Sequence, residues 1–377
     1  MIDVKLTYKF NNDEKVINID RKEYLNPDHI QVYAREGDTI YVNDGDYVYI
    51  NQLIKESSNG IKSYATVSGN VSIENDVITI TNDSTDSSFV SSKARETLDE
   101  VKKEDIIKIT EELGIEYENK LIVDKLKGNS KVLVVNAMDI EPYQFNNNYL
   151  FEEYASVLLD TIDLLSKRFN IDAYLLLNKY DDNNIRTVKE LIGKHPDINF
   201  KVINDVFPFN TNPLIAKKFF NDLKYEDIMF LDSFALYKIY YAIKNELPVD
   251  FRYVTVCLPE QDKAYVIKTK YGVNTGSLIN ETIGNITEGK DVYLNNFMRK
   301  VKCPNISSLI VTDNIRTIFV MEYDDRVVNE CIKCGKCVDI CPVKINPKAK
   351  KLDSACIRCG LCNYVCPANI NLIGKEK

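Results

Sequence analysis

The N-terminal part of the chain alternates short strand-like segments with turns. Residues 39–42 (TIYV) and 77–80 (VITI) place apolar and polar side chains in alternation, which is typical of half-buried β-strands. Turns rich in Asn, Asp and Gly separate these segments, and the Asp44-Gly45 pair favours a β-hairpin. Residues 1–83 are therefore expected to form a β-rich unit, followed by a linker rich in Ser, Thr and Asp over 84–96.

The middle of the chain has a different pattern, in which short apolar runs alternate with helical periodicity. Residues 131–136 (KVLVVN) and 173–178 (AYLLLN) are continuous enough for strands buried on both faces. Residues 200–203 and 228–231 repeat that signal. The segment between the first two runs has apolar residues at helical spacing: Leu150, Tyr154, Leu158, Ile162, Leu165 and Phe169. This order predicts a parallel sheet built from βαβ units, and short strands return from residue 252 to about 319.

Charge is unevenly distributed along the chain. The formal net charge is −8, but the residues from Cys331 onward carry nine Lys or Arg against three Asp or Glu, which leaves −14 for the rest. A chain with this balance is a poor candidate for nucleic-acid binding, which needs a basic face. No apolar run is long enough to span a bilayer, and the first residues lack a signal-peptide pattern. A cytoplasmic protein is expected, held at a membrane only through a partner complex.

The strongest chemical signal is a repeated cysteine pattern near the C-terminus. Of ten cysteines, eight lie in the last 47 residues, in two runs of the form C-x-x-C-x-x-C-x-x-x-C-P. This is the bacterial pattern for two [4Fe–4S] clusters, in which the fourth cysteine of each run ligates the other cluster. One cluster is therefore assigned to Cys331, Cys334, Cys337 and Cys366, and the other to Cys356, Cys359, Cys362 and Cys341.

Two alternatives explain the cysteines less well. Structural zinc sites use two ligand pairs, which leaves the third cysteine of each run and the exact repeat of the order without a role. A disulfide framework is not expected in a chain without a secretion signal. Cys257 and Cys303 stand apart and are interpreted as structural thiols. The lysines between the two runs either form a solvated loop or a docking face for an acidic redox partner: Lys344, Lys348, Lys350 and Lys351.

The order of segments around these cysteines resembles the RnfC family, named after a component of the Rnf electron-transport complex. That family includes the cobalamin reductase of propanediol microcompartments and an electron-transfer protein associated with proline reductase. Residues 42–54 and 65–71 look like its N-terminal barrel-sandwich hybrid, and residues 131–143 (KVLVVNAMDIEPY) look like the first strand and loop of its flavin domain. Residues 240–256 resemble the run into its SLBB β-grasp domain.

The resemblance implies a multidomain α+β and α/β chain of four units. These are a barrel-sandwich hybrid over 1–83, a flavin-type α/β domain similar to the flavin-binding part of respiratory complex I over 97–248, an SLBB-like β-grasp domain over 249–322 and a dicluster ferredoxin domain over 323–377. It also implies FMN contacts for Asn136 and Glu141, which match the family's flavin-side loop.

The glycine-rich segments of the family are altered in this chain. Where the family has a glycine-rich loop before the flavin strand, residues 114–122 keep one glycine and add Glu116 and Glu118, whose charge opposes a phosphate. A second Gly-rich segment is replaced by residues 208–213 (PFNTNP). The flavin and NADH sites are therefore interpreted as degenerate.

One-electron relay between redox partner proteins is the expected function, with the two clusters as the only redox centres. One alternative is an FMN-dependent subunit that oxidises NAD(P)H and passes single electrons to the clusters. The other is a scaffold or adaptor in which the clusters are structural. No residue stands out as a general acid, base or nucleophile, so no catalytic residue is assigned.

Overall fold

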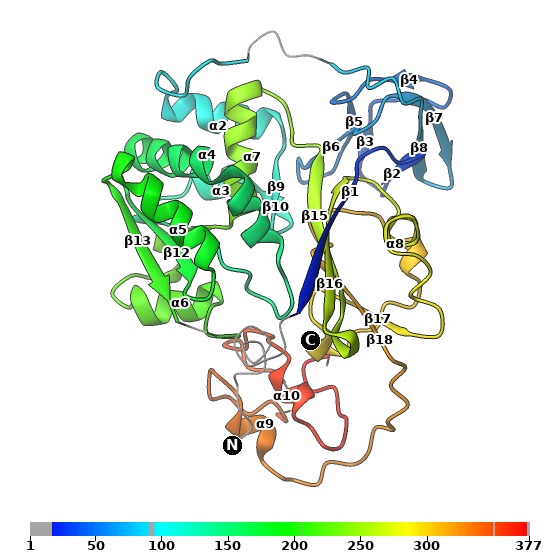
Figure 1. The fold of residues 1–377 in the computed structure, drawn as a ribbon, viewed down its shortest axis with the longest axis vertical. Coiled ribbons are helices and arrows are strands. Elements are labelled where there is room, and N and C mark those ends of the chain that lie inside the picture. The colour runs from blue at the N-terminus through cyan, green and yellow to red at the C-terminus, as the bar shows by residue number, and fades with distance from the viewer. Residues whose placement is uncertain (1–16, 90–93, 205, 350, 375–377) are drawn as a thin grey trace.

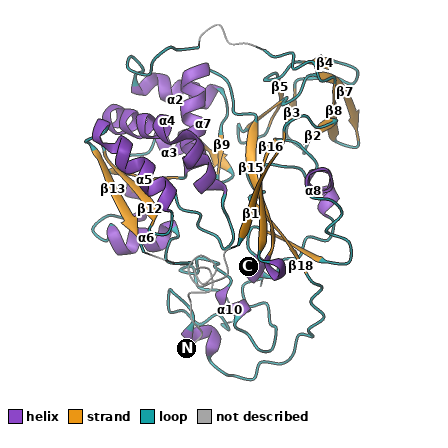
Figure 2. Cartoon of the chain, in the orientation of Figure 1, coloured by secondary structure: helices purple, strands orange, loops and turns teal. Residues whose placement is uncertain are grey.

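The computed structural model of the chain describes residues 17–89, 94–204, 206–349 and 351–374. A mixed sheet runs through the middle of the molecule, with an α/β unit on one side and two small antiparallel sheets beside its upper end (Figure 1). The cysteine-rich module lies at the opposite end, and Figure 2 shows that it consists mainly of loops. The protein therefore has the mixed α and β composition expected from the sequence.

The central sheet has five strands in the order β1-β16-β15-β18-β17. Its strands are β1 (Asn18–Tyr24), β15 (Phe251–Leu258), β16 (Lys263–Lys270), β17 (Asp291–Leu294) and β18 (Thr317–Met321). The helix α8 (Thr275–Thr282) covers one face, and the side chain of Asn274 caps it by accepting from the N–H groups of Gly276 and Ser277.

The first strand differs from the sequence expectation. Residues 1–83 are predicted to form one β-rich unit, but β1 pairs in parallel with β16, from Asn18 beside Lys263 to Tyr24 beside Thr269. The strand therefore completes the edge of the central sheet instead of joining the N-terminal unit. Local pattern contains no information about which sheet a strand joins, and the partner of β1 lies more than 200 residues away in the sequence.

The α/β unit contains a four-stranded parallel sheet in the order β13-β12-β11-β14. The strands are β11 (Val132–Asn136), β12 (Asp172–Asn178), β13 (Ile198–Ile203) and β14 (Ile228–Leu231). All five positions of β11 are buried, as its continuous apolar run predicts. The βαβ pattern derived from the sequence is confirmed, with boundaries that differ by one or two residues.

Helices cover both faces of this parallel sheet. Leu133 and Val135 face a core shared with α4 (Asn146–Phe169) and α7 (Ser233–Asn245), whereas Val132 and Val134 face α6 (Asn212–Phe219). The remaining elements of the unit are α2 (Lys103–Glu112), β9 (Glu116–Tyr117), β10 (Lys120–Leu121), α3 (Ile122–Leu126) and α5 (Asp182–Leu191). The helix α4 ends where Asn170 adopts a left-handed conformation, a common helix stop.

Two small antiparallel sheets make up the N-terminal unit. One has the order β2-β8-β7-β4 and the other β3-β5-β6. Their strands are β2 (His29–Tyr33), β3 (Thr39–Ile40), β4 (Tyr47–Val48), β5 (Leu53–Glu56), β6 (Lys62–Tyr64), β7 (Gly69–Glu74) and β8 (Val77–Asn82). The hairpin predicted at Asp44-Gly45 is wrong, because the turn there joins β3 to β4, which pair with β5 and β7.

The predicted linker is anchored at both of its described ends. Residue Ser88 forms a β-bridge with Ile50, and Asp83 accepts hydrogen bonds from Ser68 and Thr85. On the far side, the Arg95 amide donates to the carbonyl of Lys244 at 2.7 Å, and its guanidinium pairs with Glu246 at 2.9 Å. Residues 90–93, which belong to the predicted linker, lie outside the described residues.

The central sheet is buried because other units cover both of its faces. All eight residues of β15 are buried. Phe251 and Tyr253 pack into the core of the α/β unit, whereas Val254 and Val256 pack into a core that includes α8 and the N-terminal sheets. None of the helices in the described ranges combines the length and the apolar character required to cross a bilayer.

A buried charge cluster joins the α/β unit to the central sheet. Asp313 accepts from Lys238 of α7, from Arg252 of β15 at 2.9 Å and from the hydroxyl of Tyr271 at 2.5 Å. Burial raises the pKa of Asp313, but the two cations outweigh it and hold that pKa below its ordinary value. The carboxylate is therefore ionised at neutral pH and neutralises one of two buried cations.

We expect Asp313→Ala to destabilise the protein by about 3–5 kcal/mol, because it leaves Lys238 and Arg252 buried without their counter-ion. The measurement is the urea unfolding midpoint of the holoprotein. Glu111→Ala, which removes an exposed ion pair with Lys127, serves as the control and is expected to change stability by less than about 1 kcal/mol. Equal effects of the two substitutions would contradict the assignment.

Candidate iron–sulfur site

The two cysteine runs fold into two loops with the same backbone. Left-handed residues recur at matching positions 25 apart: Lys333 and Arg358, Gly335 and Gly360, Lys344 and Asn369. Each glycine precedes a short helix, α9 (Lys336–Asp339) in the first run and α10 (Leu361–Tyr364) in the second. This repeated curl turns the first three cysteines of each run toward a common point.

The glycine of the second loop also permits a close approach. A Cβ at Gly360 would lie 2.8 Å from the backbone carbon of Met298, whereas a Cβ at Gly335 would meet nothing nearer than 3.8 Å. Gly335 is therefore needed for its conformation alone. Gly360 is needed both for its conformation and for the contact between its loop and the 3₁₀-helix η4 (Phe297–Arg299).

Two small cavities are each lined by four cysteines. The first is lined by Cys331, Cys334, Cys337 and Cys366. The second is lined by Cys341, Cys356, Cys359 and Cys362. In both cavities the fourth cysteine comes from the other run, so the structure brings together the two sets that the sequence groups.

The thiols in these cavities fit an iron–sulfur cluster chemically. All ten cysteines are free. Within the described residues, no three His, Cys, Asp or Glu side chains converge closely enough to hold a single metal ion, whereas each cavity has four thiols around its wall. Burial raises the pKa of Cys359 to about 11 and that of Cys362 to about 12, so binding of iron must displace their protons. The amide of Arg358 lies 3.4 Å from the Cys356 sulfur and donates to it.

The two cavities differ in their exposure. Cys331 and Cys334 of the first cavity are exposed, whereas no cysteine of the second is. The second cavity adjoins the body of the protein, where Leu361 packs with Met298 and Phe207. A cluster in the first cavity is therefore the more accessible to a partner, and a cluster in the second lies between it and the other units.

Glu141 lies at the contact between the α/β unit and the second cysteine loop. Its carboxylate accepts from Asn296 at 2.6 Å and pairs with Arg299. Asn296 also donates to the carbonyl of Cys359 at 3.1 Å, and Arg299 donates to that of Arg358 at 3.0 Å. Burial raises the pKa of Glu141, and Arg299 and Asn296 oppose this shift. The residue that the family resemblance assigns to a flavin thus holds the loop of a cysteine cavity.

The side chain of Asn136 forms hydrogen bonds with the segment that stands where the family has a Gly-rich motif. Its amide donates to the carbonyl of Asn210 at 3.1 Å and to the side chain of Asn212 at 2.8 Å. Its side-chain oxygen accepts from the amide of Met138, and the residue is 2% exposed. Asn136 and Glu141 are therefore each held by a different part of the protein.

The two glutamates of the altered flavin loop also separate. Glu118 is exposed and pairs with Lys125 at 3.0 Å, whereas Glu116 is partly buried and lines a cavity that Glu118 does not line. Sequence reasoning placed both charges at one phosphate position, and it missed Asn296 and Arg299. No local signal marks these two residues, because their partners are distant in the sequence.

The two isolated cysteines and the lysines between the two cysteine runs differ in their burial. Cys257 is fully buried in β15, and burial raises the pKa of its thiol. Cys303 is partly buried, and burial raises its pKa as well. Lys344 is exposed and Lys348 partly so, whereas Lys350 lies outside the described residues.

The mixed α and β fold and the two four-cysteine cavities define an iron–sulfur protein with a ferredoxin-type module. The family model described as "4Fe-4S binding domain" matches residues 329–344 and 353–369, which include all eight clustered cysteines. Two [4Fe–4S] clusters are therefore its cofactors.

Sequence similarity to known proteins indicates a more specific class of iron–sulfur protein. The chain is 25% identical over 237 residues to the C subunit of the ion-translocating oxidoreductase complex of Buchnera aphidicola, covering 57% of this chain and 48% of the relative. The corresponding protein of Pectobacterium atrosepticum is 24% identical, with 59% of this chain and 34% of the relative covered. The resemblance to the RnfC family is thus confirmed, and the chain spans about half the length of these relatives or less.

Among solved structures, the chain is similar to an NAD⁺-reducing [NiFe]-hydrogenase in the air-oxidised state. The TM-score is 0.46 at 11% identity, with 60% of this chain and 47% of that chain covered. The H₂-reduced state gives a TM-score of 0.44 at 10% identity, over 58% of this chain and 47% of that chain.

The grouping of cysteines can be tested with two double variants. Cys334→Ser with Cys366→Ser removes two ligands from one proposed cluster, so the protein should keep about four irons per chain. Cys334→Ser with Cys341→Ser removes one ligand from each cluster and should disturb both. Iron content and electron paramagnetic resonance spectra of the anaerobically isolated, reduced protein measure the outcome. If each run held its own cluster, the two variants would exchange phenotypes.

Proposed function

We propose that the protein relays single electrons between partner proteins through its two [4Fe–4S] clusters. The observation that carries this proposal is the pair of adjoining cavities, each lined by four thiols drawn from both cysteine runs. In this assignment Cys331, Cys334, Cys337 and Cys366 hold the outer cluster. Cys356, Cys359, Cys362 and Cys341 hold the inner one. When bound, the clusters supply reversible one-electron chemistry.

The protein's own residues control access to the clusters and their surroundings. Leu361, Ile373 and Pro347 line the inner cavity and exclude water from it. Peptide N–H groups such as that of Arg358 donate to cysteine sulfur, which favours the more negative, reduced state. The outer cavity opens near exposed Cys331 and Cys334, which supports electron exchange with a partner at that end.

We further propose that the remaining units have the identities implied by the family resemblance. Paired small antiparallel sheets support a barrel-sandwich hybrid within 1–83, without β1. The parallel sheet supports a flavin-type α/β domain over 97–248, and the mixed sheet with α8 supports an SLBB-like β-grasp domain over 249–322. Residues 323–377 then form the dicluster module. In this assignment the β-grasp domain takes its edge strand from the N-terminus.

The flavin site of this α/β domain is proposed to be lost. The hydrogen bonds of Asn136 to Asn210 and Asn212 support this, as does the ion pair of Glu141 with Arg299. A flavin that used these side chains would have to replace their protein contacts. An FMN-dependent, NAD(P)H-oxidising subunit therefore remains the second candidate, favoured only by the match of these two residues to the family loop.

The partners are proposed to be redox proteins within a larger assembly. The curated relatives are named as subunits of an ion-translocating oxidoreductase complex, which supports a cytoplasmic place at the periphery of a membrane complex. The basic module and the more acidic remainder favour an acidic donor or acceptor at the outer cluster. An adaptor with purely structural clusters is the third candidate.

Cofactor content after anaerobic purification separates these candidates. We expect about eight irons and about eight acid-labile sulfides per chain, no flavin, and reduction of both clusters by dithionite. Bound FMN together with bleaching of the clusters by NADH would favour the second candidate. Clusters that no low-potential reductant can reduce would favour the adaptor.

Docking at the outer cluster can be tested by reversing the charges beside Cys334. Lys333→Glu with Lys336→Glu should slow reduction by a small acidic ferredoxin about tenfold at low salt, and added salt should remove most of the difference. Stopped-flow absorbance of the clusters measures the rate. Lys189→Glu, an exposed substitution on α5, is the control and should leave the rate unchanged. An identical rate in the double variant would reject this docking face while leaving the relay itself intact.

A further inference from the structure

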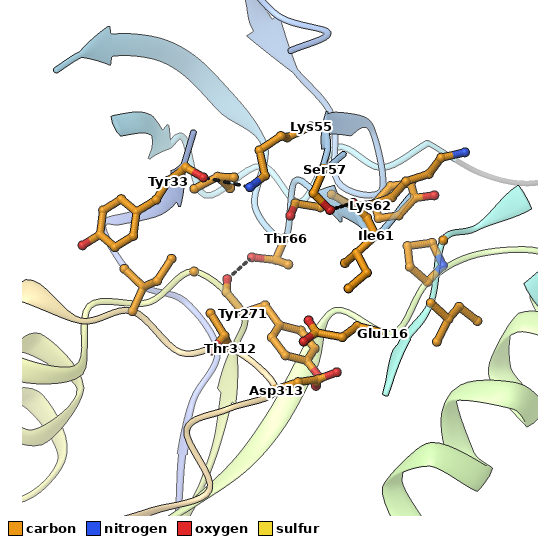
Figure 3. Close-up of a pocket in the computed structure, with 18 of the residues that line it drawn as sticks. Tyr33, Lys55, Ser57, Ile61, Lys62, Thr66, Glu116, Tyr271, Thr312 and Asp313 are labelled. Carbon is orange, nitrogen blue, oxygen red and sulfur yellow. Dashed lines mark hydrogen bonds between the residues drawn. The ribbon is translucent and has the colours of Figure 1, made fainter. Parts of the chain in front are cut away.

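A cavity lies at the junction of the N-terminal sheets, the α/β unit and the central sheet. Its volume is about 500 Å³, within the range of about 300–1,000 Å³ typical of small-molecule sites. Figure 3 shows Lys55, Lys62 and Thr66 on its upper wall, with Tyr271 and Asp313 on its lower wall. None of the eight clustered cysteines lines it, so it is separate from the iron–sulfur site.

The lysines that line this cavity already have partners. Lys55 pairs with Asp38 at 2.8 Å and donates to the carbonyl of Tyr33 at 2.8 Å. Lys62 donates to the carbonyl of Glu112 at 2.7 Å and lies 3.8 Å from Glu56. Lys238 pairs with Asp313. Arg35 is exposed at the rim, where water solvates it. The wall therefore offers an anion no unpaired, desolvated cation among the described residues.

Glu116 differs from the other acids of the cavity. Asp38, Asp250 and Asp313 each pair with a lysine, and Glu36 is exposed. The Glu116 carboxyl is partly buried and, within the described residues, makes neither a hydrogen bond nor an ion pair. Strand alternation explains its direction: Tyr117 points into the core of the α/β unit, so its neighbour Glu116 points the other way.

The surroundings of Glu116 disfavour the ionised form of its carboxyl group. Burial raises its pKa, and the nearby Asp313 carboxylate raises it further, whereas Lys238 and Arg252 oppose the shift. A desolvated carboxyl without a partner costs free energy that a hydrogen-bonded cation would recover. Figure 3 shows the Glu116 side chain reaching into the space beside the Tyr271 ring, a surface that suits a cation with an apolar stem.

We propose that this cavity binds a small organic ammonium compound, with the cationic nitrogen donating to Glu116. The hydroxyl group of Ser63 and the amide group of Asn51 belong to residues that also line the cavity, form no side-chain hydrogen bond within the described residues and suit a polar substituent of the ligand. Because three units contribute to the wall, the ligand links them. This site is independent of the proposed electron relay.

The test compares three probes of equal size and different charge on the anaerobically isolated holoprotein. Isothermal titration calorimetry with n-butylamine, n-butanol and butyrate should give n-butylamine an affinity at least tenfold above either other probe, which corresponds to about 1.4 kcal/mol. Glu116→Gln keeps the shape of the side chain and removes its charge. It should lower the affinity for n-butylamine at least tenfold and leave n-butanol binding unchanged.

Glu118→Gln is the matched control, since it removes a carboxylate of the same hairpin that is exposed and does not line the cavity. Its affinity for n-butylamine should equal that of the parent protein. Circular dichroism and iron content establish that both variants are folded. The proposal is overturned if butyrate or n-butanol binds as tightly as the amine, or if the Glu116→Gln variant retains amine binding.

Discussion

The burial of the central sheet on both faces is the constraint on which the rest of the architecture depends. Strand β15 is buried along its whole length, so one of its faces must be complementary to the α/β unit and the other to α8 and the N-terminal sheets. The units are therefore not independently folded domains joined only by linkers. They share two hydrophobic cores, and their relative positions are fixed by close packing in addition to the chain connections.

Within that frame, the two side chains that match the family's flavin-side loop make contacts within the protein. Glu141 now connects the α/β unit to the second cysteine loop through Asn296 and Arg299, and Asn136 fastens the segment around Asn210. Function must therefore be argued from the contacts at a site and not from a matching residue alone.

Sequence reasoning succeeded where a signal is local. The continuous apolar run of β11 and the paired cysteine pattern each determine their own environment, so the parallel sheet and the two groups of thiols followed from pattern and spacing. It failed where the partner is distant. Neither the pairing of β1 with β16 nor the contact of Arg299 with Glu141 leaves a periodicity to detect, because tertiary packing selects both. The cavity beside Glu116 likewise exists only once three units meet.

The exchange of fourth cysteines between the two runs has a consequence for assembly. Each loop supplies three thiols to one cavity and its last thiol to the other. Each cavity therefore needs both loops for its full set of four thiols. Among the described residues of the module, two four-residue helices, α9 and α10, are the helical elements of the backbone around them. A cluster bound in one cavity would order a loop that also supplies a thiol to the other cavity, so insertion of the two clusters is expected to be cooperative.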